Sequence, residues 1–176
     1  DLHKVDYNNY PNTNSTDVKF ATEAHVKLQE ALAKLRADST GRLVENESVF
    51  RGRSYEKNQF DDLFAGAKVG DEIPLKGYQS ASKSLDTPAA FLDKTAGDYK
   101  VIMEIEPKQG VDIDDVADYG STLGPINHSK EIPEVQVQKE VLLEEGYFRL
   151  AKDIEHKEIE VTLDGKKKKI TVYYVV

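Results

Sequence analysis

The stretch from Val135 to Leu150 constrains the fold most, because an alternating strand pattern begins there with two polar side chains. Side chains of an extended strand alternate between faces, so Gln138 and Glu140 point the same way while apolar residues such as Val141 flank them. A turn at 144–146 then leads to a second short strand. A neighbouring carboxylate and amide suit a site that steadies developing positive charge and hydrogen-bonds an incoming group. The alternative is an edge strand with two polar residues facing water.

The composition describes a globular protein and disfavours several functions. The chain has 176 residues, most simply one domain over 1–176 with an arm or loop at 1–16, and 39% of its residues are hydrophobic. The formal net charge of -8 disfavours nucleic-acid binding, which needs a basic surface. With no cysteine, and four histidines at no ligand spacing, we expect no metal site. No apolar run approaches the roughly 20 residues of a membrane span. No signal peptide opens the chain. Because the sequence starts at Asp1, we expect a processed form or a domain of a longer protein.

Periodicity and turn residues predict a mixture of helices and strands. A helix that begins at Ser15, Thr16 or Asp17 and ends near Asp38 has apolar residues at helical spacing and is expected to cover the core. A brief second helix is expected to start with Asp86 as its cap. The Asp164-Gly165 pair predicts a hairpin. Strands are expected at 47–54, 76–84, 99–106, 154–163 and 170–176, a short helix near 60–64 and a long connection at 111–133. The lysine run at 166–169 is expected to be a solvated turn, with a partner-binding patch as the alternative.

Two polar residues inside predicted strands are candidates for a site. Arg51 lies between Phe50 and Gly52, and an arginine in an apolar strand is costly to bury unless it holds an anion. A surface arginine on an edge strand is the alternative. Ser80 belongs to a strand whose serines share one face. No Gly-x-Ser-x-Gly turn surrounds it, so we expect Ser80 to orient a neighbouring carboxylate and not to act as a nucleophile.

Three motifs, in order along the chain, resemble those of the Arg-Ser-Glu class of mono-ADP-ribosyltransferases, the exoenzyme toxins. They are Phe50-Arg51-Gly52, Gly77-Tyr78-Gln79-Ser80-Ala81-Ser82, and the Gln-x-Glu motif within Gln138-Lys139-Glu140-Val141-Leu142-Leu143. The resemblance implies an α+β fold in which two roughly perpendicular antiparallel β-sheets form an NAD cleft, flanked by N-terminal helices. It also implies that ADP-ribose passes from NAD, the co-substrate, to a protein side chain and that nicotinamide is released.

The resemblance further implies which residues are catalytic. Glu140 would hydrogen-bond the nicotinamide ribose and stabilise an oxocarbenium-like transition state, and Ser80 would orient it. Gln138 stands where enzymes that modify arginine carry a glutamate, and an amide cannot deprotonate a guanidinium. Arginine is therefore an unlikely acceptor, and asparagine or glutamine of a small GTPase, or of another host protein, is favoured.

The resemblance also implies a set of cofactor-binding residues. Arg51 would bind the NAD phosphates, since the planar guanidinium matches the geometry of phosphate oxygens. Phe91 would lie against the nicotinamide, although a helical phenylalanine is also typical of a core. Lys94 would make a second phosphate contact. Together with Gly52 and Ser80, these residues complete the expected NAD site.

The leading hypothesis is thus a toxin or effector domain from a bacterium or phage, secreted or delivered into a target cell as part of a larger toxin. The first alternative is a non-catalytic module that keeps the same sheets for partner recognition. The second is an ADP-ribosyltransferase acting on guanine in DNA, which the acidic charge disfavours.

Overall fold

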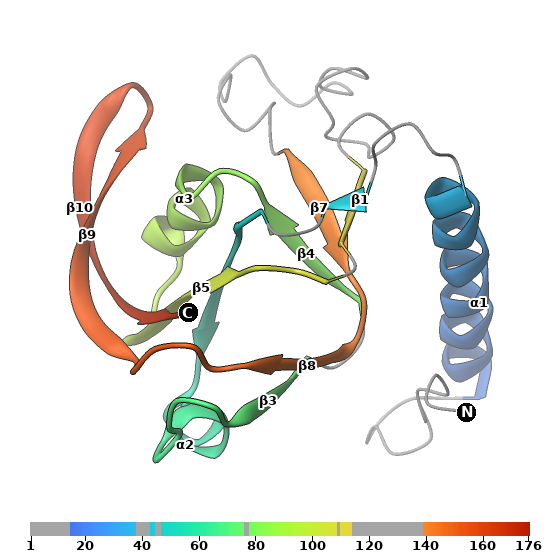
Figure 1. Cartoon of the computed structure of the whole chain (residues 1–176), viewed down its shortest axis with the longest axis horizontal. Coiled ribbons are helices and arrows are strands. Elements are labelled where there is room, and N and C mark those ends of the chain that lie inside the picture. Colours follow the sequence, from blue (N-terminus) through green and yellow to red (C-terminus); the bar gives the residue numbers. More distant parts are fainter. Residues whose placement is uncertain (1–14, 38–42, 45–46, 76–77, 109, 114–138) are drawn as a thin grey trace. The chain divides into compact units, whose positions relative to one another are not determined.

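The computed structural model describes residues 15–37, 43–44, 47–75, 78–108, 110–113 and 139–176 (Figure 1). The chain divides into two compact units, 1–42 and 43–176, which are described separately, and the single-domain hypothesis stays a prediction. In the first unit, α1 (Ser15–Ala37) confirms the predicted helix to within a residue at its end. Its last turn carries Lys34 and Arg36, whose positive charges interact favourably with the negative end of the helix dipole. None of the described helices is long and apolar enough to cross a membrane.

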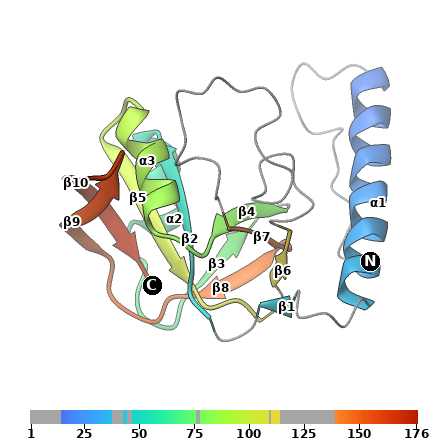
Figure 2. The same cartoon turned by 90° about the horizontal axis from the view of Figure 1, so that it is seen from above.

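The second unit is an α+β fold with one large sheet and one small one (Figures 1 and 2). The large sheet has the strand order β1-β6-β7-β4-β2-β5-β10-β9, and β3 pairs with β8 in the small sheet. The elements are β1 (Leu43–Val44), β2 (Val49–Tyr55), α2 (Lys57–Phe64), β3 (Glu72–Leu75), β4 (Gln79–Ser82), α3 (Asp86–Lys94), β5 (Tyr99–Ile105), β6 (Gly110–Asp112), β7 (Glu140–Leu143), β8 (Gly146–Arg149), β9 (Glu155–Leu163) and β10 (Lys166–Val175).

The large sheet consists of two halves that meet at one residue pair. β2 pairs with β5 along its whole length, and β4 pairs with β7 along its whole length. Between β2 and β4, only Phe50 and Ser82 are in register. In Figure 2, β4 and β7 accordingly run in a different direction from β2 and β5. The two halves separate beside this pair, at the position of the predicted site.

The sheets are not wholly antiparallel, contrary to the expectation from the resemblance. β10 pairs with β5 in parallel, with Tyr174 opposite Ile102. The reason is the placement of the hairpin that β9 and β10 form. β9 lies at the outer edge of the sheet, so the returning arm, β10, is the inner one and runs in the direction of β5.

Alternation along β2, β5 and β10 directs their apolar side chains into two separate clusters. One face packs under α3, where Leu92 contacts Ile102 and neighbouring residues. The other face packs on α2 and the small sheet, around Phe60 and Phe64. These two clusters hold the β2–β5 half of the sheet from both sides and fix the strand that carries Arg51.

Local sequence explains how the two short helices begin. In α2, the Glu56 side chain accepts the N3 backbone N–H, and Gln59 Oε1 accepts the Glu56 N–H at 3.2 Å, which completes a capping box. In α3, the prediction that Asp86 caps the helix is wrong, since the N-cap is Leu85. Asp86 Oδ1 instead accepts the Thr162 N–H at 2.9 Å, because β9 lies beside the helix. The carboxylate therefore ties α3 to β9.

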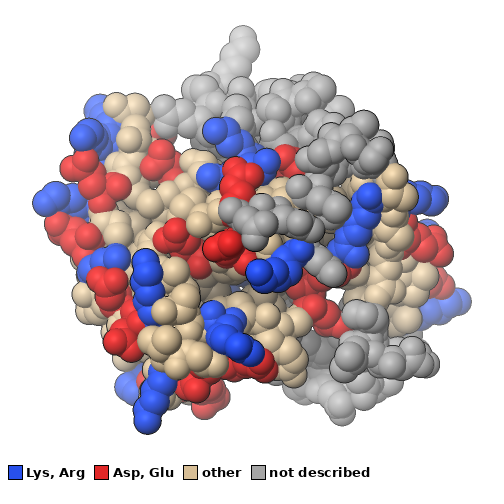
Figure 3. Space-filling view, viewed as in Figure 1, with Lys and Arg blue, Asp and Glu red and all other residues tan. Residues whose placement is uncertain are grey.

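The predicted hairpin at Asp164-Gly165 is confirmed, but the prediction that 166–169 form a turn is wrong. Asp164 and Gly165 have φ of 52° and 69°, the two positive values of a two-residue hairpin turn. This short turn places Lys166 directly opposite Leu163, so the lysine run belongs to β10. Lys167 pairs with Glu160, Lys169 with Glu158 and Lys168 with Asp93. Figure 3 shows the resulting mixture of acidic and basic side chains over this hairpin.

A polar network joins β5 to β10 beside α3. Glu104 accepts hydrogen bonds from Ser48 Oγ at 3.1 Å and from the Tyr174 hydroxyl at 2.8 Å. Lys157 Nζ lies 4.3 Å from the centre of the Tyr174 ring. Burial, and then the hydrogen bond to Glu104, raise the pKa of Tyr174 well above its ordinary value of 10.0. The protonated phenol is therefore favoured in the folded state.

This network predicts a loss of stability in alkali. A phenol whose pKa is raised by folding contributes stability that is fully present below its unfolded pKa and is lost as the pH rises above about 10. The urea midpoint of the wild type should therefore fall more steeply above about pH 10 than that of Tyr174→Phe. The exposed Tyr147 provides the control, since Tyr147→Phe should keep the steep fall. Parallel curves for all three proteins would contradict the expected linkage.

Candidate active site

The predicted carboxylate and serine lie on adjacent strands and are hydrogen-bonded to each other. β4 and β7 are antiparallel neighbours, with Ser82 opposite Glu140 and Ser80 opposite Leu142. Ser80 and Glu140 are thus a diagonal pair on one face, within reach of polar side chains. Ser80 Oγ donates to Glu140 Oε1 at 2.6 Å. The predicted orienting contact is present, whereas the catalytic role of both residues stays a prediction.

Arg51 reaches the same serine from the other half of the sheet. Its Nη1 donates to the Ser80 carbonyl oxygen at 2.9 Å. Phe50 is in register with Ser82, and Arg51, its neighbour in β2, points to the opposite face of the strand. The guanidinium therefore contacts the backbone of Ser80 and not its hydroxyl. Two hydrogen bonds therefore link the guanidinium, the serine and the carboxylate through one residue.

The environment of Arg51 suits an incoming anion. The side chain is half-buried, and burial lowers its pKa below the ordinary value; Tyr55 opposes this effect and the charge of Arg53 adds to it. Within the described part of the chain, no carboxylate forms an ion pair with Arg51. A partly desolvated cation beside a second cation is stabilised by an anionic ligand, and a guanidinium retains several donors after one hydrogen bond.

Gly52 is explained by packing. An added Cβ would lie 2.9 Å from both Pro88 Cβ and the Pro88 carbonyl oxygen, and 3.2 Å from Leu92 Cδ1. Only glycine therefore lets α3 approach β2 this closely, and this approach fixes the strand position next to Arg51. A direct contact of Gly52 with NAD stays a prediction.

Phe91 and Lys94 both lie on α3 and are both exposed. Phe91 is 61% exposed, so the alternative that it belongs to the core is wrong. Its ring is accessible to a ligand, as is the Lys94 amine at the last turn of the helix. Their predicted contacts with nicotinamide and phosphate are untested. Gln138, and most of the connection at 111–133, lie outside the described residues.

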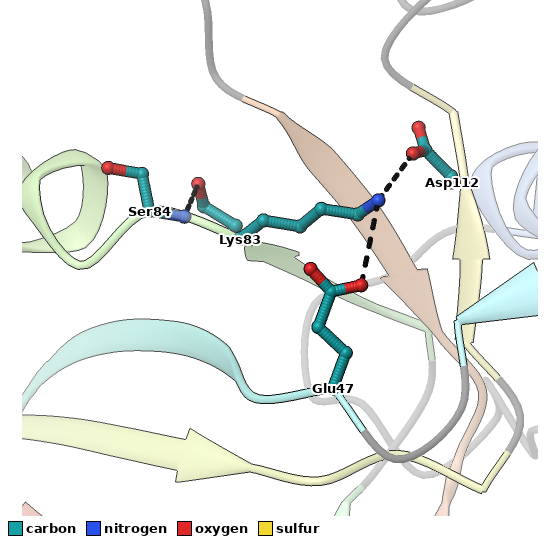
Figure 4. Close-up of polar contacts among 5 residues, drawn as sticks. Glu47, Lys83, Ser84 and Asp112 are labelled. Carbon is teal, nitrogen blue, oxygen red and sulfur yellow. Dashed lines mark hydrogen bonds and ion pairs between the residues drawn. The ribbon is translucent and has the colours of Figure 1, made fainter.

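Sequence reasoning missed a cluster of charges beside Glu140. Lys83, directly after β4, forms an ion pair with Asp112 at the end of β6, and Glu47 lies near the same amine (Figure 4). Next to Glu140, Lys139 has a φ of 47°, which residues other than glycine seldom adopt. The only signal in the sequence is that a lysine follows the Ser-Ala-Ser motif, and this does not identify its partners. Among the described residues, no group of three or more acidic or histidine side chains could hold a metal ion.

ADP-ribosyltransferases are among the solved structures that match this chain. Vis ADP-ribosyltransferase in complex with an inhibitor matches with a TM-score of 0.48 and 15% identity over 93% of the chain. Vis with bound agmatine gives a TM-score of 0.48 and 13% identity, and the Vis toxin from Vibrio splendidus gives 0.47 and 14%. The chain spans 63% of the length of the first of these. No protein-family model matches the chain, and the comparison with curated proteins gives no relative. The case for a function therefore rests on the residues of the site.

Proposed function

We propose that the protein is an NAD-dependent mono-ADP-ribosyltransferase that transfers ADP-ribose to a protein side chain other than arginine and releases nicotinamide. The observation that carries this proposal is the 2.6 Å hydrogen bond between Ser80 Oγ and Glu140 Oε1, with the Arg51 guanidinium on the Ser80 carbonyl. These three residues come from the three motifs and lie far apart in the sequence. A use as a toxin or effector domain, delivered as part of a longer protein, belongs to the same proposal.

The chemistry asked of these residues follows from charge. When the bond between the ribose C1′ and the nicotinamide nitrogen breaks, its electron pair leaves with nicotinamide and positive charge develops on the ribose. A carboxylate at Glu140 stabilises that charge, and the Ser80 hydroxyl holds the carboxylate in one orientation. The acceptor nucleophile then forms the new bond at C1′ and loses its proton to the surrounding water. Arg51, half-buried without a carboxylate partner among the described residues, suits the diphosphate of NAD.

The direct test is release of nicotinamide from NAD, followed by chromatography, with and without lysate of candidate target cells. Mass spectrometry of lysate incubated with isotopically labelled NAD identifies the modified side chain. Folded wild-type protein that releases no nicotinamide under either condition would overturn the proposal. Agmatine adds a comparison, since Vis has been solved with agmatine bound. Because Gln138 cannot deprotonate a guanidinium, agmatine should not accelerate nicotinamide release by this chain.

NAD binding should depend on Arg51 and much less on Arg53. A ligand that binds only the folded state at about 100 times its Kd stabilises it by about 2.7 kcal/mol, which raises the Tm by roughly 5–10 °C. Arg51→Leu should weaken NAD binding about tenfold or more, because a charge-assisted contact with phosphate is lost. Arg53→Leu is the matched control. Arg53 lies two residues further along β2, but it is exposed and stacks on Tyr55. A thermal-shift titration with NAD measures both variants.

The same titration separates the enzyme from a non-catalytic module. A module that recognises only a protein partner leaves the Tm unchanged by NAD in the wild type and in both variants. Equal weakening in Arg51→Leu and Arg53→Leu would indicate general electrostatic attraction and contradict a specific phosphate contact.

A further inference from the structure

The backbone that presents Glu140 is held from both sides. Lys139 lies in the left-handed region of φ, and its carbonyl oxygen accepts a hydrogen bond from the Lys83 N–H at 3.1 Å. On the other side of β7, the Glu140 carbonyl oxygen accepts the Ile113 N–H at 3.0 Å. Hydrogen bonds thus hold the start of β7 to Lys83, which follows β4, and to Ile113, which follows β6. Backbone at a rarely populated φ persists only where its surroundings hold it.

A side-chain ion pair joins Lys83 to Asp112, the last residue of β6 and the neighbour of Ile113. Lys83 Nζ lies 2.9 Å from Asp112 Oδ2, and the two side chains are only 27% and 30% exposed. Glu47 lies 3.9 Å from the same amine and is 57% exposed, so water screens it more (Figure 4). Lys83 therefore connects the segment after β4 to β6, across the start of β7, mainly through Asp112.

The ion pair lies away from the Glu140 side chain. Asp112 is in register with Val141, the buried neighbour of Glu140, and neighbouring residues of a strand face opposite sides. The register therefore places Asp112 and the Glu140 side chain on opposite faces of the sheet. The two backbone hydrogen bonds on either side of β7 connect the ion pair to the backbone of Glu140.

We propose that Lys83 and Asp112 are positioning residues for Glu140: their ion pair clamps the segments flanking β7 and so fixes the strained backbone from which the carboxylate projects. The catalytic part of this inference rests on the proposed function. A carboxylate that must meet one developing charge is sensitive to its backbone, since a displacement of about 1 Å can cost about a hundredfold in rate.

The kinetic test compares Asp112→Asn and Lys83→Met with Glu47→Gln, which removes the weaker partner of the same amine. Asp112→Asn and Lys83→Met should lower kcat for nicotinamide release about tenfold or more and leave KM for NAD within about twofold, because Glu140 acts in the transition state. Glu47→Gln should stay near the wild type. Lys83→Arg, which keeps the charge, should recover most of the kcat. Equal losses in all variants, or a loss in KM alone, would overturn the positioning role.

A second measurement does not depend on enzyme activity. Hydrogen exchange of the amides at positions 83 and 113, followed by NMR, reports the two backbone bonds directly. Exchange at both amides should be at least about tenfold faster in Asp112→Asn than in Glu47→Gln. If Asp112→Asn does not fold, Lys83→Gln, which keeps a donor without the charge, replaces it. Unchanged exchange overturns the clamp, whatever the activity. If wild-type protein has no activity but exchange changes as expected, the proposed function fails while the clamp stands.

Discussion

Glu140→Gln is expected to lower kcat for nicotinamide release at least about a hundredfold, the usual size of the loss when one group that stabilises transition-state charge is removed. Glutamine has nearly the shape of glutamate, and its amide oxygen can still accept the Ser80 hydroxyl, which donates at 2.6 Å in the wild type. The fold and the hydrogen bond are therefore kept, while the negative charge is lost. A steady-state assay with saturating NAD measures the effect, and circular dichroism confirms the fold.

Glu106→Gln is the matched control for this prediction. Glu106 is exposed and directly follows β5, so the same chemical change is made next to the same sheet at a residue that belongs to none of the three motifs. It should leave kcat within about twofold. Activity retained in Glu140→Gln would remove Glu140 from the reaction, and a similar loss in both variants would point to a general effect of charge.

Gly52→Ala is expected to destabilise the fold by about 1–3 kcal/mol, as overpacking of a well-packed site does, and to lower the Tm by several degrees. The new methyl group would lie 2.9 Å from the Pro88 carbonyl oxygen, which belongs to the backbone of α3 and cannot swing away. Either α3 lifts off β2 or the strand shifts. Because Arg51 precedes this glycine, a shifted strand should also weaken NAD binding.

Gly146→Ala in β8 is the control, since a Cβ there meets nothing within 4 Å. Alanine restricts the unfolded chain more than glycine, so this variant should be as stable as the wild type or slightly more stable. Urea unfolding of both variants measures the difference. Equal stability of Gly52→Ala and the wild type would show that α3 moves without cost and would contradict the packing explanation.

The elements that short-range patterns determine were predictable from the sequence. The alternation over 99–106 identified β5, and Asp164-Gly165 identified the hairpin turn. What failed depended on neighbours in space. Lys166 to Lys169 join β10 because the two-residue turn brings them into register with β9, where glutamates form ion pairs with Lys167 and Lys169. Asp86 bonds to β9 instead of capping its helix. Such partners follow from strand register, which a single sequence does not reveal.

The same limit applies to the candidate site. The resemblance brought Ser80 and Glu140 together, and the structure places them on adjacent strands at hydrogen-bonding distance. The Lys83–Asp112 ion pair could not be predicted, since it joins segments that meet only once β4 and β6 have both paired with β7. The backbone conformation of Lys139 could not be predicted either, because no propensity rule gives a lysine a positive φ.

The place of β10 inside the sheet has a consequence for synthesis. This strand is built from residues 166–175 yet lies between β5 and β9, bonded to both. Until β10 has been translated, the backbone groups on one edge of β5 therefore lack their strand partner. The apolar side chains that β10 will cover remain exposed to solvent. The β2–β5 half of the sheet, which carries Arg51, therefore cannot be completed before β10 has left the ribosome, although β2 and β5 emerge much earlier.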